Sequence, residues 1–385
     1  MGHLSMSGGH NLAMLVGNGL SVAFSDQLEL GSISAEMIRR FTSEYPGSDA
    51  VAQAMHKVAD HQLTGDPAKD FEILIGAFGG QSDILEDLAT FANLTKGGDP
   101  DIVNSIQRVR DFASEVQRRG VGHTLEIITE RSYSDTYRRG PVNALFDNVL
   151  GAFTNHVTVA NLNYDLIVLS ALMDHKRILS DMAHGKYDGG TIAFAGEKHR
   201  TWRIRESVAE FMPLSSRRLR LLHLHGSLTF WRFGEDHRKI QVDAVRLSSL
   251  WQTYRDEDTF NGHPLIVLAN QNDKAKHIQR FPFNLAYDIA DTDLKDADHW
   301  LIVGYSFRDE CVNDLLSQAW EARRGLPTTI LVSTYGNDLT TDTIEDALGW
   351  SRGSADTNNL TVNRDGAFDL CSSPEWTAFI RPVNR

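Results

Sequence analysis

Apolar residues along the chain are grouped in short runs that predict a buried β-sheet. Each run holds four to six mostly apolar residues and ends in small or polar ones. Strands of a sheet covered on both faces have such continuous runs, whereas strands with one face in water alternate. The pattern therefore predicts an α/β fold with a Rossmann-like, doubly wound parallel sheet. Its strands are expected at residues 12–16, 156–160, 219–224, 265–268, 300–303 and 329–333.

A long segment with the period of a helix separates the first two predicted strands. Apolar residues recur there at helical spacing, and Pro46, Gly65 and Pro67 interrupt the pattern. A compact βαβ connection needs only about 30 residues, so we expect a large helical insertion after the first strand. Helices are expected at residues 35–44, 50–62, 71–78, 84–94 and 102–118.

These patterns divide the chain into three predicted parts. The Rossmann domain is expected at residues 10–30 and 150–340, the helical insertion at 31–149 and a C-terminal extension at 341–385. Within the Rossmann domain, the polar and basic segment 185–218 is expected to be irregular, as a mobile lid or an interface. Beyond residue 336 we expect one helix at 343–350, a loop rich in Gly, Asp and Asn, and a short tail.

Charge and composition narrow the functional classes. The chain has 38 basic and 51 acidic residues, and the net charge of -13 disfavours direct nucleic-acid binding. Two cysteines, Cys311 and Cys371, are too few for a disulfide framework or a four-thiolate zinc site. No apolar run approaches the ~20 residues that span a bilayer, and the N-terminus lacks the features of a secretion signal. We expect a cytoplasmic protein without membrane contact.

The first predicted strand runs directly into the sequence GNGLS, residues 17–21. Its glycines allow a backbone to approach an anion closely. The N-terminus of a helix that begins near Ser21 would also attract a pyrophosphate. The motif lacks the third glycine of the usual dinucleotide fingerprint, and a tight turn between strand and helix is the alternative interpretation.

Polar residues also follow the second and third predicted strands. The sequence ANLNYD places Asn163 and Asp165 at a carboxyl strand end, where such sheets bind ligands. Capping of the next helix explains these two residues equally well. The sequence HLHGS places His225 beside Gly226 at the next strand end, where an imidazole can act as a base. His223 is expected to support it or to be a core residue, since further ligands for a metal site are missing.

The fifth predicted strand ends in VGYSF, residues 303–307, and leads into a helix expected at 309–320. Gly304 and Ser306 are again small or polar groups at a strand end. They indicate a contact with an anion or a ribose, and a helix N-cap is the alternative.

The order of these motifs resembles that of the sirtuin superfamily. Sirtuins carry a GAG-x-S turn, a Thr-x-Asn-x-Asp motif, a catalytic His-Gly and a Gly-x-Ser, and this chain has GNGLS, NLNYD, HG and GYS in the same order. The resemblance implies that NAD is the substrate, with Asn163 near the nicotinamide ribose and His225 as general base. The implied cofactor-binding residues are Gly17, Asn18, Gly19 and Ser21 at the phosphates, Asp165 at the nicotinamide amide, Gly304 and Ser306 at phosphate or the adenine ribose, and Ser333 near the adenosine end.

The chain departs from protein-deacylating sirtuins after the His-Gly motif. Deacylases carry two Cys-x-x-Cys pairs there, which form a zinc module beside the peptide groove. Residues 228–263 contain no cysteine and form an aromatic-rich segment instead, so no zinc or other bound metal is expected. Asp70-Phe71-Glu72 resembles an acidic and aromatic element of bacterial sirtuin-like NAD hydrolases, and the start of a helix is the alternative.

These features resemble the bacterial NAD-degrading branch of the superfamily. The resemblance implies an NAD hydrolase (NADase) that cleaves NAD to nicotinamide and ADP-ribose, as the regulated effector of an antiphage defence system. A protein deacylase or ADP-ribosyltransferase is the alternative enzyme, and a non-catalytic sensor of NAD or ADP-ribose is the alternative binding protein. The family also implies a homo-oligomer formed through the helical region, and a partner such as a P-loop translocase ATPase or a short Argonaute.

Overall fold

The computed structural model describes residues 10–44, 88–92, 94, 100–134, 139–184, 188–257, 259–268 and 271–381. The helices predicted at 50–62 and 71–78 lie outside the described residues, as do Asp70-Phe71-Glu72 and part of the helix predicted at 84–94.

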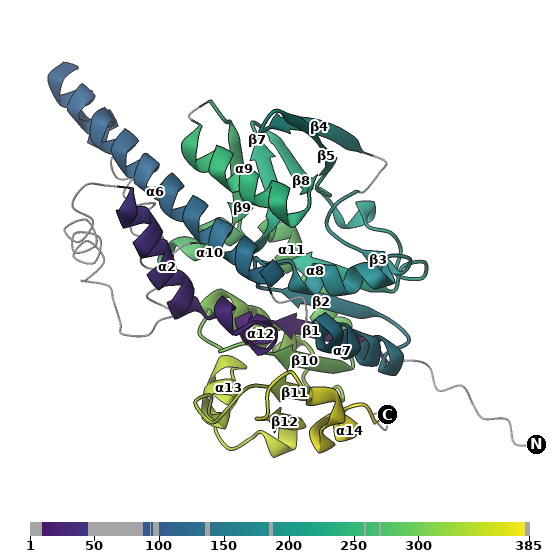
Figure 1. Cartoon of the computed structure of the whole chain (residues 1–385). Coiled ribbons are helices and arrows are strands. Elements are labelled where there is room, and N and C mark those ends of the chain that lie inside the picture. The colour runs from purple at the N-terminus through teal and green to yellow at the C-terminus, as the bar shows by residue number, and fades with distance from the viewer. Residues whose placement is uncertain are drawn as a thin grey trace, which may run out of the picture.

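A parallel sheet forms the centre of the described structure and confirms the predicted α/β class (Figure 1). β1 (Leu12–Val16) lies in the middle, between β2 (Val157–Asn161) and β10 (His299–Val303). All six neighbouring pairs among its seven strands are parallel. The order is β12–β11–β10–β1–β2–β6–β3, in which the outer strands are β3 (Leu179–Ser180), β6 (Leu219–His223), β11 (Thr329–Ser333) and β12 (Leu360–Asn363).

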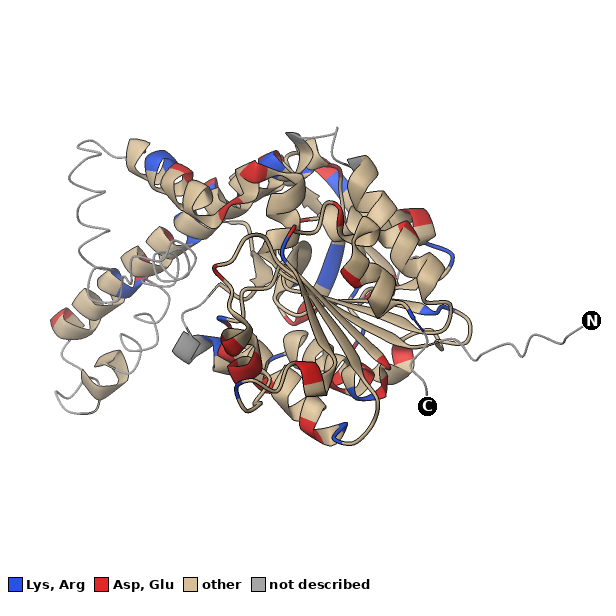
Figure 2. Ribbon diagram, turned by 90° about the horizontal axis from the view of Figure 1, so that it is seen from below, with Lys and Arg blue, Asp and Glu red and all other residues tan. Residues whose placement is uncertain are grey.

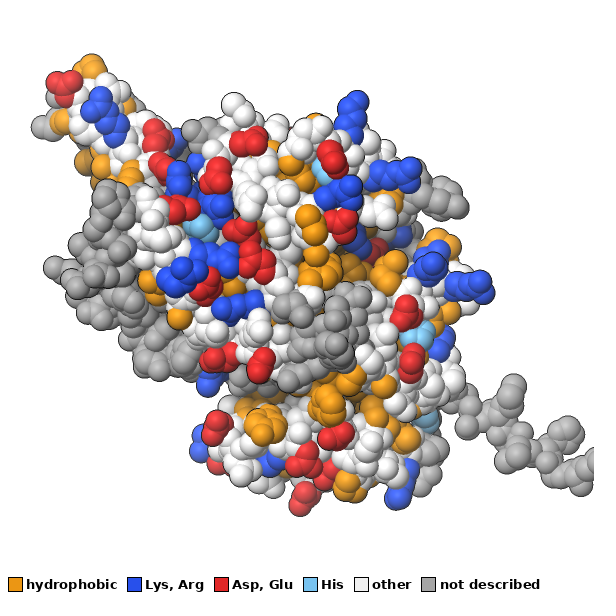
Figure 3. Space-filling model, in the orientation of Figure 1, with side chains coloured by type: hydrophobic (Ala, Val, Ile, Leu, Met, Phe, Trp, Pro, Cys, Tyr) orange, Lys and Arg blue, Asp and Glu red, His pale blue; other side chains and the backbone are white. Residues whose placement is uncertain are grey.

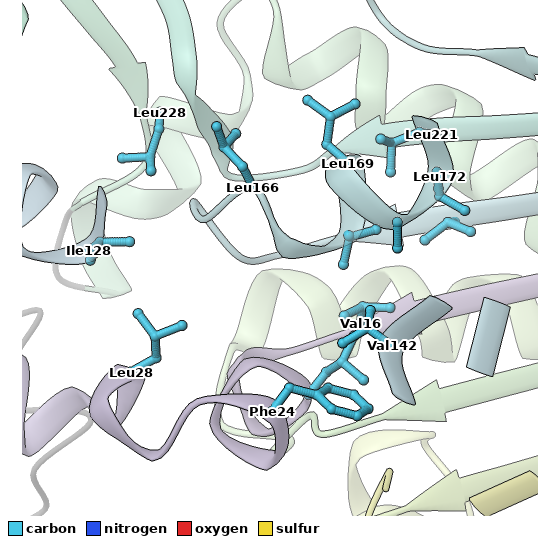
Figure 4. Packing of buried hydrophobic residues seen from close by; sticks show 14 of the residues in the cluster. Val16, Phe24, Leu28, Ile128, Val142, Leu166, Leu169, Leu172, Leu221 and Leu228 are labelled. Carbon is cyan, nitrogen blue, oxygen red and sulfur yellow. The ribbon is translucent and has the colours of Figure 1, made fainter. Parts of the chain in front are cut away.

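Helices cover both faces of this sheet, because successive strand residues point to opposite sides. Met14 and Val16 belong to one hydrophobic cluster, part of which Figure 4 shows, and Leu15 and Ile302 belong to the other. The strands carry few charged residues, whereas charged residues of both signs mark the surrounding helices (Figure 2). The covering helices are α1 (Asn18–Phe24), α7 (Arg139–Ala152), α8 (Ile167–Leu172) and α14 (Pro374–Phe379) on the first face, and α11 (Phe283–Asp296), α12 (Glu310–Ala322) and α13 (Thr341–Ala347) on the second.

The described part of the segment between β1 and β2 is helical, as predicted. α2 (Leu30–Ser43) packs against α6 (Pro100–Ser134), which is longer at its C-terminal end than the predicted helix at 102–118. One end of α6 extends well beyond the neighbouring elements (Figure 1). Among the described residues, no helix is both long enough and apolar enough to cross a membrane.

The C-terminal half of α6 packs against α9 (Ala244–Asp256) and forms polar contacts with it. The indole nitrogen of Trp251 donates a hydrogen bond of 2.9 Å to the hydroxyl of Thr129. Arg255 donates to Glu126 at 2.6 Å. The Trp251 ring also packs against Trp231, with ring centroids 4.7 Å apart. The helical insertion is therefore joined to the chain that follows the His-Gly motif.

Strands from both sides of the His-Gly motif form a second sheet, which was not predicted from the sequence. The strand expected at 265–268 is not in the parallel sheet: β9 pairs antiparallel with β7 in the second sheet. An apolar run indicates burial but not the direction of pairing, which explains the error. The order of this sheet is β4–β5–β8–β7–β9, with β4 (Gly189–Phe194), β5 (Glu197–Arg203), β7 (Gly226–Phe233), β8 (Asp236–Gln241) and β9 (Gly262–Ile266).

Two further expectations of irregular structure were wrong. The segment 185–218 contains the β4–β5 hairpin, whose turn has Ala195 and Gly196 at positive φ. Only one residue of β4 and two residues of β5 are buried, so these strands lack a continuous apolar run. The C-terminal extension adds β12 to the parallel sheet and α14 to its first face, where Trp376 and Phe379 are buried.

The contact between α6 and α9 yields a prediction for stability. Thr129→Val keeps the side-chain shape but leaves the buried indole N–H of Trp251 without its acceptor. Such a loss costs about 1–3 kcal/mol, so urea denaturation should show a free energy of unfolding lower by that amount. Thr124→Val is the matched control, because this buried hydroxyl bonds only to the carbonyl of Gly120 in the same helix. An equal loss of unfolding free energy in the two variants would show that the hydrogen bond between Trp251 and Thr129 adds nothing specific to stability.

Candidate active site

A cavity of about 820 Å³ lies at the carboxyl ends of the parallel strands. It lies where the strand order reverses, since the chain continues from β1 to β2 on one side and returns through β10 on the other. Open α/β sheets bind ligands at this kind of position. Of the predicted site residues, Ser21 is buried beside the cavity, and those that line it are Gly17, Asn18, Gly19, Asn163, Asp165, His225, Gly304, Ser306 and Ser333.

Two backbone turns touch beside this cavity, one after β1 and one after β10. Gly17 N donates a hydrogen bond of 3.0 Å to the carbonyl of Val303, and Gly19 N donates one of 2.8 Å to the carbonyl of Gly304. A Cβ added to Gly304 would lie 2.2 Å from Leu20 N, and the φ of Gly304 is +65°. Both the close contact and the conformation therefore require glycine at this position.

In this contact, the backbone amides of the predicted phosphate-binding turn bond to the protein itself. The amides of Gly17, Gly19 and Leu20 all donate to protein carbonyls. α1 begins at Asn18, three residues before the predicted start, and the Asn18 side chain donates to the carbonyl of Leu28. The alternative interpretation, a tight turn between strand and helix, thus describes the observed hydrogen bonds. A role of these residues at a phosphate remains a prediction.

Asn163, Ser21 and Asp165 form a buried chain of hydrogen bonds. Asn163 Nδ2 donates to the carbonyl of Gly17 at 3.0 Å and to the Ser21 hydroxyl at 2.8 Å. The Ser21 hydroxyl donates to Asp165 Oδ2 at 2.6 Å. A backbone carbonyl only accepts hydrogen bonds, so the contact with Gly17 fixes the orientation of the Asn163 amide. The amide oxygen of Asn163 is then the group available to a ligand in the cavity.

Asp165 has a structural role in addition to its place at the cavity. Its Oδ1 accepts a hydrogen bond of 2.9 Å from Ile167 N at the start of α8, so the helix-capping alternative is observed. Burial raises the pKa of Asp165, against the hydrogen bonds from Ser21 and Ile167, which lower it. The carboxyl group therefore holds Ser21, and through it Asn163, in one position.

His225 lies two residues beyond the end of β6 and is the centre of a second group of polar side chains. Its Nε2 is 3.4 Å from Oδ2 of Asp309 and 3.3 Å from the hydroxyl of Tyr287. Lys274 Nζ donates to the same oxygen of Asp309 at 2.8 Å. His225, Asp309 and Lys274 are buried, and Lys274 is only 1% exposed. We refer to these four residues as the His225 cluster.

The two histidines of the HLHGS motif differ in their surroundings. Burial lowers the pKa of His225 to about 4, although the carboxylate of Asp309 raises it. The imidazole of His225 is therefore neutral at pH 7 and able to accept a proton. His223 packs against Phe230, and neither ring nitrogen has a hydrogen-bond partner among the described residues. Burial lowers the pKa of His223 to about 3, so of its two predicted roles it has that of a core residue.

Three members of the His225 cluster were missed by the sequence analysis. Lys274 lies in α10 (Gln271–Ile278), and Tyr287 lies in α11. Asp309 accepts a hydrogen bond from Val312 N as the N-cap of α12. An Asp before a helix is expected as a cap whatever its other roles, and a lysine in a polar segment looks like a surface residue. The one available signal was that Asp309 follows GYSF in the loop that carries Gly304 and Ser306.

The two predicted serines, Ser306 beyond β10 and Ser333 at the end of β11, have different surroundings. Ser306 is exposed. Ser333 is buried, and its hydroxyl donates to the side-chain oxygen of Asn363 at the end of β12. No group of three or more metal-ligating side chains occurs among the residues that the structure describes.

Residues outside the motifs complete the cavity. The helical insertion contributes an apolar wall that includes Ile33 and Ile128. The C-terminal segment contributes Tyr335 and Phe368, which are 86% and 51% exposed. Hydrophobic side chains appear on the surface of the lobe that this segment forms in Figure 3. Elements from both ends of the chain therefore enclose the predicted site.

The contact between the two turns can be tested with Gly304→Ala. The variant should unfold at lower urea concentration and lose NAD affinity in calorimetry, because a Cβ at residue 304 collides with the backbone of residues 19–20. Gly325→Ala is the matched control: Gly325 also has a positive φ (+86°), but no atom lies within 4 Å of its added Cβ. The control should cost about 1–2 kcal/mol from its conformation alone and bind NAD normally. A Gly304→Ala protein no less stable than the control would contradict the required contact.

Comparison with known proteins identifies the family of the chain that carries this site. No curated protein matches the chain. A family model described as the SIR2-like domain matches residues 157–351, which is half of the chain. The match begins with β2 and includes Asn163, His225 and Gly304, whereas the GNGLS turn precedes it. Membership fits a superfamily of NAD-using enzymes, in agreement with the resemblance of the motifs. The chain belongs to the SIR2-like domain family.

Proposed function

We propose that this protein is an NAD hydrolase that cleaves NAD to nicotinamide and ADP-ribose. The observation that carries the proposal is the meeting of Asn163 and His225 in one cavity of a SIR2-like domain. The first offers an amide oxygen of fixed orientation, and the second offers a neutral imidazole.

The cavity has the properties expected of a dinucleotide site. Its volume lies in the upper part of the range of small-molecule sites, about 300–1,000 Å³. The lining is apolar along the helical insertion and polar along the strand ends. Glycines at residues 17, 19 and 304 leave backbone rather than side chains at the point where β1 and β10 end. We propose that NAD lies across these strand ends.

The chemistry requires a leaving group, charge stabilisation and a nucleophile. Nicotinamide leaves as a neutral molecule from a cationic ring, so an oxocarbenium-like charge develops at C1′ of the ribose. Asn163 would hold the ribose or the attacking water through its amide oxygen. His225 would take a proton from the water as its oxygen bonds to C1′ and the bond from C1′ to nicotinamide breaks. The products are nicotinamide, ADP-ribose and one proton.

Water is the proposed acceptor because the segment after the His-Gly motif has none of the Cys-x-x-Cys pairs that deacylases carry there. Residues 228–263 contain no cysteine, and their described residues form β7, β8 and α9 and lead into β9. The insertion residues Ile33 and Ile128 line the cavity. A protein deacylase or an ADP-ribosyltransferase remains the second candidate, and the transfer of ADP-ribose or of an acyl group would identify it.

We further propose that the enzyme is the regulated effector of an antiphage defence system. Uncontrolled NAD loss would kill the host cell, so the activity needs a trigger. The long exposed end of α6 gives the helical insertion a surface for contacts, and Val109 and Phe112 are 53% and 62% exposed there. We propose this region for a second copy of the chain and for a partner such as a P-loop translocase ATPase or a short Argonaute.

Two substitutions test the proposed catalytic residues. His225→Ala and Asn163→Ala should each lower NAD hydrolysis on the order of 10²–10⁴-fold, because one removes the base and the other the oriented amide. Nicotinamide and ADP-ribose are measured by chromatography, and circular dichroism checks folding.

His175→Ala and Asn148→Ala are matched controls, since both residues lie away from the cavity lining on helical surface. Their turnover should equal that of the wild type. Undiminished turnover in a folded His225→Ala or Asn163→Ala protein would refute its role. If the isolated wild type binds NAD without hydrolysing it, the assay is repeated with lysate of phage-infected cells. Binding without products there would identify a sensor.

The pH dependence of turnover gives a second test. A base must be unprotonated, and the pKa of His225 is lowered to about 4 by burial. The value of kcat/KM should therefore rise with pH through about 4 and be level from pH 5 to 8. An ordinary histidine would give an inflection near pH 6.5. An inflection near pH 6.5 in the wild-type profile would exclude His225 in its observed surroundings as the base.

A further inference from the structure

We infer that Asp309, paired with Lys274, is a positioning residue that holds His225 with Nε2 protonated and presents Nδ1 to the cavity as the base. This inference rests on the proposed hydrolase function and assigns the proton acceptor to one atom. It also assigns a role to two buried charged residues that the proposed reaction does not otherwise use.

The position of Asp309 determines the hydrogen on His225. Its Oδ2 is 3.4 Å from Nε2, and a carboxylate can only accept a hydrogen bond. A hydrogen on Nε2 is favoured by this oxygen, because a lone pair there would face a negative charge. The hydroxyl of Tyr287, 3.3 Å from the same nitrogen, can accept from it as well. Nδ1 forms no hydrogen bond to the described residues, and His225 lines the cavity.

The carboxylate of Asp309 is itself held in place by two hydrogen bonds. Its Oδ1 accepts from Val312 N in the first turn of α12, and its Oδ2 accepts from Lys274 Nζ. Phe307, two residues earlier, has a φ of +57°, so the turn after Gly304 reverses sharply before it reaches Asp309. Burial raises the pKa of Asp309, but the attraction to His225 in its protonated form, the charge of Lys274 and the hydrogen bonds from Lys274 and Val312 outweigh burial and lower it. The carboxyl group therefore stays ionised in a buried position.

Asp309 and Lys274 shift the pKa of His225 in opposite directions. The carboxylate stabilises the imidazolium that forms when Nδ1 takes a proton from water, and the lysine charge opposes it. Lys274 therefore holds the carboxylate in place and limits the rise that the carboxylate causes in the pKa of His225. His225 thus stays neutral before the reaction. The arrangement follows the logic of a base oriented by a buried carboxylate.

Other titratable groups near the cluster add little charge at pH 7. Burial raises the pKa of the Cys311 thiol and raises the pKa of the Tyr287 phenol well above its ordinary value, so both are neutral. Tyr164 and Tyr305 also lie near Tyr287. The remaining charged or acidic groups at the cavity are Asp165, whose pKa burial raises, exposed Arg308 and Asp365.

The test uses three variants that change the charges of the pair. Asp309→Asn removes the carboxylate and keeps a good N-cap. Lys274→Met removes the cation at similar length, and the double variant removes both charges together. Asp243→Asn is the matched control, because Asp243 is the N-cap of α9 with the same bond to a backbone N–H, away from the cavity lining.

Nitrogen NMR of ¹⁵N-histidine-labelled protein reads the ring hydrogen directly and needs no turnover. His225→Gln identifies the His225 signals. We expect the Nε2–H form in the wild type and in Asp243→Asn, and loss of that preference in Asp309→Asn. A wild-type ring with its hydrogen on Nδ1, or an unchanged ring in Asp309→Asn, would overturn the inference.

The titration and the rate complete the test. The pKa of His225 should rise in Lys274→Met, where only the carboxylate remains, and fall in Asp309→Asn, and the double variant should lie between them. The acid limb of kcat should move in the same directions, and kcat at pH 7 should fall on the order of 10²-fold in Asp309→Asn. Shifts of the same sign in both single variants would overturn the inference. The expected NMR result together with no NAD hydrolysis by the wild type, either isolated or in lysate of phage-infected cells, would refute the proposed function alone.

Discussion

The candidate active site depends on the contact between two backbone turns that have no room for side chains. The turn after β1 and the turn after β10 share hydrogen bonds, and a Cβ on Gly304 would overlap Leu20 N. This contact brings two segments that are about 285 residues apart in sequence to the same edge of the sheet. It carries Gly17, whose carbonyl orients Asn163, and it starts the loop that ends at Asp309. The two polar groups of the site are therefore placed by one backbone contact.

Asn163 and His225 differ in the chemical group that each offers to the cavity. Asn163 is held by hydrogen bonds that use both of its amide hydrogens, so it can offer only an oxygen. His225 is surrounded by groups that are charged or that bond to its ring, and burial keeps it neutral. Both residues are held by contacts within the protein. A preorganised acceptor and a neutral base are what hydrolysis of a cationic nicotinamide bond requires.

The sequence predicted what depends on local pattern and missed what depends on pairing between distant segments. The strand at 329–333 and most of the parallel sheet were predicted because apolar runs indicate buried strands. The run at 265–268 was assigned to the wrong sheet, since nothing in it specifies its partner. His225 was found because it follows a strand directly. Lys274 and Tyr287 reach the same site from helices whose own sequence patterns are ordinary.

The helical insertion forms part of the candidate site, because it supplies one wall of the cavity. Ile33 and Ile128 line the cavity, and Thr129, the next residue of α6, holds Trp251 of α9. α9 packs on the second sheet through Trp231 of β7, and β7 begins at the residue after His225. A displacement of α6 would therefore change the apolar wall and the support of His225, the proposed base, at the same time. If a partner binds the exposed end of α6, as proposed, it controls the reaction through one rigid helix, because the same helix forms the wall of the cavity.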